Sequence, residues 1–157
     1  MVSERAVERL THEAVNNVRS VRDLPTLQAD RDLRHIARRH SLDMSDRQFV
    51  GHSTPTGTSL GDRYERYDYD CRAPMESPGR YATGGENIAL LHLGVPSKRS
   101  DGKTMTYETA EELAHGAVWG WMNSPGHREN LLRSYWRREG IGATIDGTSV
   151  YITQNFC

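Results

Sequence analysis

The histidine at position 127 lies in a local sequence that could present a neutral imidazole to a ligand. It belongs to the stretch Trp121–Leu132, W-M-N-S-P-G-H-R-E-N-L-L. Ser124 has the side-chain oxygen of a helix N-cap and Pro125 suits the first helical position, so we expect a helix with His127 in its first turn. The positive end of the helix dipole disfavours imidazolium, so His127 should stay neutral, with a lone pair to offer. The alternative is a helix start whose histidine only packs.

Two further side chains could carry chemistry. Glu86 follows Gly84 and Gly85, which permit a tight turn or a close backbone approach, and it precedes an apolar run. Its carboxylate is therefore expected at a well-defined point, either for chemistry or to cap a backbone turn. His52 lies in the polar loop sequence Gly51-His52-Ser53, where a histidine can also be simply solvated.

Other histidines are interpreted as structural. His40 falls on the inner face of a helix expected over 31–46, and we expect it to be a satisfied core residue. His12 and Glu13 begin the H-E-x-x-H pattern of zinc proteases, but Asn16 stands where the second histidine is needed. We therefore reject that motif and expect His12 at the surface.

Periodicity and capping residues predict the helices that position these side chains. Apolar residues recur at helical spacing over 4–19 and 31–46. Thr109 and Glu112 form a capping box for a third long helix over about 107–122. A short helix is predicted over 60–67.

The C-terminal residues predict a β-hairpin. Ile141–Ile145 and Ser149–Phe156 have strand character, and Asp146-Gly147 between them favours a type I′ turn. Helices around a small antiparallel sheet indicate an α+β fold, a three-layer α-β-α sandwich.

Composition excludes several classes of protein. The chain has 157 residues, and we predict a single domain over 1–157 with an ordinary core. Lys plus Arg is 20, Asp plus Glu is 21 and the net charge is −1, so no basic excess points to nucleic acid. No apolar run approaches the ~20 residues of a transmembrane helix.

The two cysteines bear on location. Cys71 and Cys157 either pair, which would tie down the C-terminus, or remain buried free thiols. A disulfide would point to an oxidising compartment. Residues 1–20 are a charged amphipathic stretch rather than a signal peptide, so either the protein is intracellular or a leader has been removed. We predict the disulfide and an extracellular or cell-surface location, with the leader absent from this chain.

Short motifs in a fixed order now point to a family. They are Ala37–Met44, Gly51–Ser53, Gly85–Ala89, Trp121–Leu132, Gly140–Gly142 and Tyr151–Phe156. Together they extend over nearly the whole chain. The chain resembles the CAP superfamily of cysteine-rich secretory proteins, antigen 5 and pathogenesis-related 1, and within it the prokaryotic branch of SCP-like extracellular domains.

The resemblance implies an α-β-α sandwich with a central cleft on which His52, Glu86 and His127 converge. Two imidazoles and a carboxylate are reasonable ligands for Zn²⁺ or another divalent metal with an open position. The same set could handle protons without metal. Many eukaryotic members have a second glutamate where this chain has Ser124. That departure weakens the expected metal affinity and removes the most obvious general base.

Two functions compete at this point. The first is an extracellular binding module whose cleft holds a small ligand, such as a lipid, a peptide or a cell-surface component. The alternative is a metal-assisted hydrolase or peptidase with His52, Glu86 and His127 as the catalytic residues. The sequence supplies a cleft but no clear nucleophile paired with a base, which favours binding. A structural or adhesive role is a third hypothesis, and fold analogy does not choose among them.

Overall fold

A computed structural model describes all residues from 1 to 157. The helices are α1 (Glu4–Ser20), α2 (Arg31–Asp46), α3 (Leu60–Arg66), α4 (Ala110–Met122) and α5 (Pro125–Leu132). The strands are β1 (Gln28–Ala29), β2 (Ala73–Pro74), β3 (Tyr81–Ala82), β4 (Gly85–His92), β5 (Ser97–Lys98), β6 (Thr104–Met105), β7 (Arg138–Asp146) and β8 (Ser149–Phe156).

The helices begin where capping chemistry predicts. Ser3 caps α1 and Asp30 caps α2 through side-chain oxygens that accept backbone N–H groups. The capping box of Thr109 and Glu112 is confirmed, so the third long helix begins at Ala110 rather than near residue 107. No helix is long and apolar enough to cross a membrane.

The central sheet has four strands in the order β1-β7-β8-β4. β7 and β8 form the predicted hairpin, β4 pairs antiparallel with β8, and the short β1 pairs parallel with β7. The turn was predicted one residue too early. Asp146 still pairs with Ser149, and only Gly147 has a positive φ, 58°, whereas a type I′ turn needs positive φ at both central residues.

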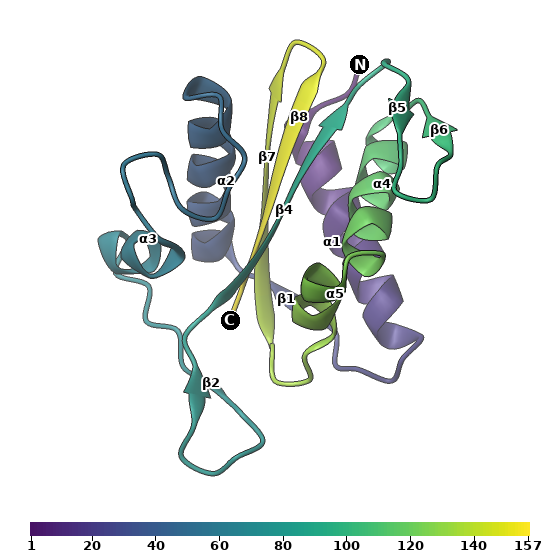
Figure 1. The fold of residues 1–157 in the computed structure, drawn as a ribbon. Helices are drawn as coiled ribbons and strands as arrows, with labels where there is room; N and C mark the ends of the chain where they lie inside the picture. The colour runs from purple at the N-terminus through teal and green to yellow at the C-terminus, as the bar shows by residue number, and fades with distance from the viewer.

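Helices cover both faces of the sheet, which confirms the three-layer α-β-α sandwich. Figure 1 shows α2 and α3 on one side and α1, α4 and α5 on the other. Two glycines of β7 let α2 approach closely. A Cβ at Gly140 would lie 2.0 Å from the backbone nitrogen of Arg34, and one at Gly142 would lie 2.1 Å from that of Arg38. Only glycine permits this contact.

The two faces have cores of different size. Between the sheet and α1, α4 and α5 lies a cluster of 18 buried hydrophobic residues that includes Trp121 and Trp136. The α2 side has a cluster of four: Leu33, Ile36, Tyr64 and Cys71.

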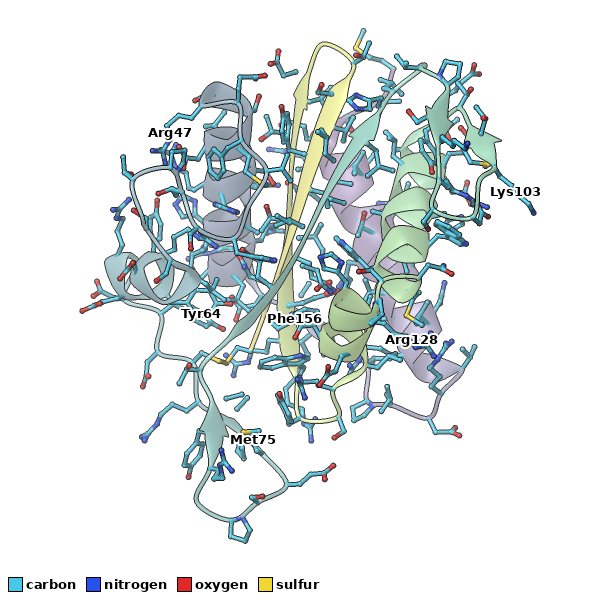
Figure 2. The ribbon with its side chains drawn as sticks, viewed as in Figure 1. Arg47, Tyr64, Met75, Lys103, Arg128 and Phe156 are labelled. Atoms are coloured by element: carbon cyan, nitrogen blue, oxygen red, sulfur yellow. A yellow bond between two sulfur atoms is a disulfide. The ribbon has the colours of Figure 1, made fainter.

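The predicted disulfide between Cys71 and Cys157 is present, with Cα atoms 5.7 Å apart. Its yellow bond is visible near the C-terminus in Figure 2. Nearby, the Tyr64 hydroxyl donates to the backbone oxygen of Phe156 over 2.8 Å. The end of β8 is therefore tied both to the Cys71 loop and to α3.

Candidate functional site: a histidine pair beside a buried glutamate

Glu86 lies at the start of β4 and is buried, with 4 % of its surface exposed. The two preceding glycines determine how the strand enters. A Cβ at Gly84 would lie 2.6 Å from the ring of Tyr64, and one at Gly85 would lie 2.7 Å from the ring of Trp136. The expected close backbone approach is confirmed, because the chain passes between two aromatic rings to deliver the carboxylate.

Both oxygens of the Glu86 carboxylate are engaged by side chains. Oε2 accepts from Arg63 Nη2 over 2.5 Å and from Asn155 Nδ2 over 2.8 Å. Oε1 lies 3.0 Å from His52 Nδ1. Arg63 also donates from Nη1 to the backbone oxygen of His52 over 2.7 Å, which anchors the His52 loop to α3.

The surroundings of Glu86 keep it ionised. Burial alone would raise the pKa of its carboxyl group, but the hydrogen bond from His52 and the positive charge of Arg63 outweigh burial and hold the pKa below its usual value. An ionised carboxylate only accepts hydrogen bonds, so His52 Nδ1 is the donor in that contact.

His40 lies behind this carboxylate and is fully buried. Its Nε2 lies 2.8 Å from the backbone oxygen of Gly51 and 3.8 Å from Glu86 Oε1. Burial lowers the pKa of His40. It was predicted to be a satisfied core residue, which is correct for Nε2 only, since Nδ1 is buried without a hydrogen-bond partner.

The ring of His127 lies near the ring of His52. The ring centroids lie 6.5 Å apart, with an angle of 44° between the planes. Burial, and next the charge that His52 can carry, lower the pKa of His127, so its imidazole tends to be neutral as predicted. The prediction gave the helix dipole as the cause, and burial and the neighbouring imidazole act in the same direction.

Ser124 corrects one detail of the prediction. It occupies the N-cap position of α5, Pro125 follows at the first helical position, and His127 comes two residues later. The side chain of Ser124, however, makes no capping hydrogen bond. The hydroxyl lies 2.9 Å from His127 Nδ1 instead, so Ser124 orients the imidazole rather than the helix backbone.

A groove of about 530 Å³ extends from His127 along β4. One wall is β4 from Ile88 to His92, the opposite wall is α4 from Gly116 to Trp121, and Ser97–Ser100 lies across the far end. The wall is mostly apolar. His52 and Glu86 do not line it, so the histidine pair lies at its end rather than along its floor.

Comparison with known proteins identifies the family. The model of the cysteine-rich secretory protein family, CAP, matches residues 12–156. The chain belongs to the CAP family. The curated relative YkwD of Bacillus subtilis is 31 % identical over 146 residues, which is 93 % of this chain and 46 % of YkwD.

Solved structures agree on the fold. An extracellular protein with an SCP domain from Bacillus anthracis is 29 % identical, with a TM-score of 0.65, covering 98 % of this chain and 40 % of that one. An outer surface protein of Borrelia burgdorferi has a TM-score of 0.69 at 17 % identity. The match covers 94 % of this chain and 89 % of that one. This CAP domain thus spans less than half the length of YkwD and of the Bacillus anthracis chain.

In this CAP domain, the three residues predicted to converge do lie together, although their catalytic and metal-binding roles stay predictions. No group of three or more His, Cys, Asp or Glu side chains has the arrangement of a metal site. Sequence reasoning missed Arg63 and Asn155 as partners of Glu86. Arg63 was recognised only as part of a short helix, and no local signal pairs it with a residue 23 positions away.

The sequence interpretation of His12 was only partly correct. Its side chain is 25 % exposed, but its Nδ1 lies 2.6 Å from Oε1 of the buried Glu139. That hydrogen bond raises the pKa of His12 against the opposing effect of burial. Glu139 also accepts from Gln154 Nε2 over 2.6 Å. A second carboxylate–histidine pair, made of a buried glutamate and a partly exposed histidine, therefore lies on the α1 side of the sheet.

Proposed function

We propose that this CAP domain is an extracellular binding module that holds a small ligand in the groove beside its histidine pair. The observation that carries the proposal is the engagement of Glu86. Its carboxylate is ionised, buried and bonded to Arg63, Asn155 and His52, so it serves to position His52. These bonds make Glu86 a poor general base, which counts against a hydrolase that would use this carboxylate to take a proton.

The proposal includes a divalent cation held by the two histidines. Because His52 donates from Nδ1 to Glu86, its lone pair is on Nε2, which is the arrangement in which a carboxylate orients a metal-binding imidazole. His127 offers Nε2 in the tautomer whose Nδ1 donates to Ser124. Glu86 supports the pair and is not itself a ligand.

The spacing of the rings fits a cation after a small movement. With zinc–nitrogen distances of about 2.0 Å and tetrahedral angles, two ligating rings have centres about 5 Å apart. The observed separation is 6.5 Å. The His52 side chain is 54 % exposed and lies in a loop, so it has room to approach His127. A bound cation would act as a Lewis acid that attracts anionic or carbonyl oxygen from a ligand.

Two observations support a location outside the cell. The Cys71–Cys157 disulfide is typical of oxidising compartments. The similar proteins from Bacillus anthracis and Borrelia burgdorferi are described as extracellular and as an outer surface protein, respectively.

Calorimetric titration with Zn²⁺ tests the cation site. We expect His52→Ala and His127→Ala each to weaken Zn²⁺ binding at least about tenfold, since each removes a ligand. His115→Ala is the matched control, because His115 is an exposed histidine outside the pair, and it should bind as the wild type does. Equal affinity in all four proteins would rule out this cation site.

A further inference from the structure

The groove along β4 contains unpaired main-chain groups. β4 is an edge strand with only β8 beside it. The Leu93 N–H bonds to Thr148 across the β4–β8 ladder, while Ile88 O accepts from Trp121 Nε1 and Glu86 O accepts from Asn130, both outside the sheet. Odd-numbered residues therefore direct their main-chain groups to β8, and even-numbered residues direct theirs to the groove.

The open part of this edge is short and well bounded. At one end the Trp121 indole donates a hydrogen bond from Nε1 to the backbone oxygen of Ile88 over 2.9 Å. At the other end Tyr107 forms a parallel bridge with Leu93 and accepts from the Gly94 N–H over 2.7 Å. Between them remain the N–H groups of Ile88, Leu90 and His92 and the oxygen of Leu90. These three donors and one acceptor match the edge of an extended peptide.

The opposite wall leaves room for an added strand. Gly120 of α4 lines the groove, and a Cβ placed on it would meet nothing within 4 Å. Figure 1 shows the β5–β6 hairpin beside α4, where it closes the far end. The volume of about 530 Å³ lies within the range of about 300–1,000 Å³ that ligand pockets occupy.

The charge of the lining selects among peptides. The basic residues along the groove are His92, Lys98, Arg99 and His127, and no aspartate or glutamate lines it. Arg99 is paired with Asp101 and stacks on Trp119, whereas the exposed Lys98 has no carboxylate partner. An occupant with carboxylate side chains would therefore be complementary to the wall.

We infer that the ligand of this domain is an extended acidic peptide that adds as a strand to the free edge of β4. The inference names the ligand class of the binding module proposed above and rests on that proposal. It does not depend on the cation, so a failed Zn²⁺ titration and a failed peptide titration are separate results.

Nuclear magnetic resonance on the ¹⁵N-labelled chain tests the inference. The probe is a pool of acetylated, amidated pentapeptides with Asp or Glu at alternate positions and Val, Leu or Thr between them, at about 1 mM. We expect the amide signals of Ile88, Leu90 and His92 to shift and their hydrogen exchange to slow at least about tenfold as they become hydrogen bonded. A pool with Lys in place of the acids should not do this.

Two variants and a control locate the binding. Gly120→Leu fills the groove and improves helix propensity, so it should fold and weaken pool binding at least about tenfold. Lys98→Glu, at an exposed position, should weaken binding severalfold. Gly61→Leu in α3, away from the groove, is the matched control and should bind as the wild type does.

Several outcomes would overturn the inference. They are no shift of these amides with the acidic pool, equal binding by Gly120→Leu, or equal binding of peptides N-methylated at the central residue, which cannot pair through that group. Shifts that depend on protein concentration alone would assign the edge to a second copy of the chain and would also overturn it.

Discussion

Two buried glutamates lie on opposite faces of the same sheet and are built from similar parts. Glu86 faces α2 and Glu139 faces α1, and each carboxylate is hydrogen bonded to one histidine, His52 or His12. Each carboxylate also accepts a hydrogen bond from a side-chain amide of β8. The two amides belong to the consecutive residues Asn155 and Gln154. Successive side chains of a strand point to opposite faces, so one strand serves both sites.

The two sites differ in what balances the buried charge. Glu86 is paired with the guanidinium of Arg63, a type of group that stays charged in proteins. Glu139 has no lysine or arginine within ion-pair distance and is paired only with His12. The negative charge of Glu86, at the α2 site, is thus balanced by a permanent positive charge. The charge of Glu139, at the α1 site, is balanced by a histidine, a group that titrates near physiological pH.

The faces also differ in how they are stabilised. The α1 face has the cluster of 18 buried hydrophobic residues, and the α2 face has four, together with the ion pair and the disulfide. Directional bonds therefore contribute a larger share of the stability on the α2 face, where Glu86 lies, than on the α1 face. This contrast predicts which changes will affect the surroundings of Glu86 most.

The largest expected effect is the loss of the disulfide. Cys71 and Cys157 are 86 residues apart, and releasing a loop of that length should lower the free energy of unfolding by about 4 to 5 kcal/mol on the chain-entropy model. Urea denaturation of the oxidised and reduced protein measures it, with the Cys71→Ala/Cys157→Ala variant as a check on the reduced form. An unchanged midpoint would mean that the apolar contacts of α2 are sufficient by themselves.

The second-largest expected effect is the loss of the positive charge of Arg63. Arg63→Met leaves Glu86 buried without its ion-pair partner and should lower the free energy of unfolding by about 3 kcal/mol, because breaking a buried pair leaves an uncompensated charge. Arg66→Met, an exposed position on the same helix, should change it by less than about 0.5 kcal/mol. Similar midpoints for the two variants in denaturant would remove the distinction between the two glutamates.

Local patterns predicted the long helices and the C-terminal hairpin, but neither the strand β4 nor the bonds of the site. The capping of α1, α2 and α4 and the β7–β8 hairpin depend on neighbours in sequence, so they were predicted well. β4 was seen only as an apolar run, because its strand pairing is with β8, more than fifty residues away.

The site was predicted as a set of residues, through family motifs, but its bonds were not. Ser124 was predicted to cap α5, and only the position of the His127 ring turns its hydroxyl elsewhere. His12 appeared to be on the surface because Glu139, which buries its ring nitrogen, is 127 residues away. Contacts of that range depend on how the helices pack, which no local pattern encodes.

The smallest expected effect is a pH dependence that belongs to the α1 site alone. The hydrogen bond to Glu139 raises the pKa of His12 above its unfolded value of 6.5. The pair is therefore fully stabilising below about pH 6.5 and loses its contribution as the pH rises through the folded pKa. For Glu86, whose pKa is lowered, the stabilisation is present above about pH 4.5 and is lost only as the pH falls through the folded pKa.

His12→Gln separates the two sites, because glutamine keeps a donor to Glu139 but does not titrate. We expect wild type to exceed this variant in the free energy of unfolding by about 1 kcal/mol at pH 6, since a charged donor makes the stronger hydrogen bond, and the difference should shrink at pH 9. His40 and His127 are present in both proteins and cancel in the comparison. A difference that stays constant from pH 6 to 9 would show that Glu139 is balanced by something other than the His12 charge, and the contrast between the two glutamates would then rest on Arg63 alone.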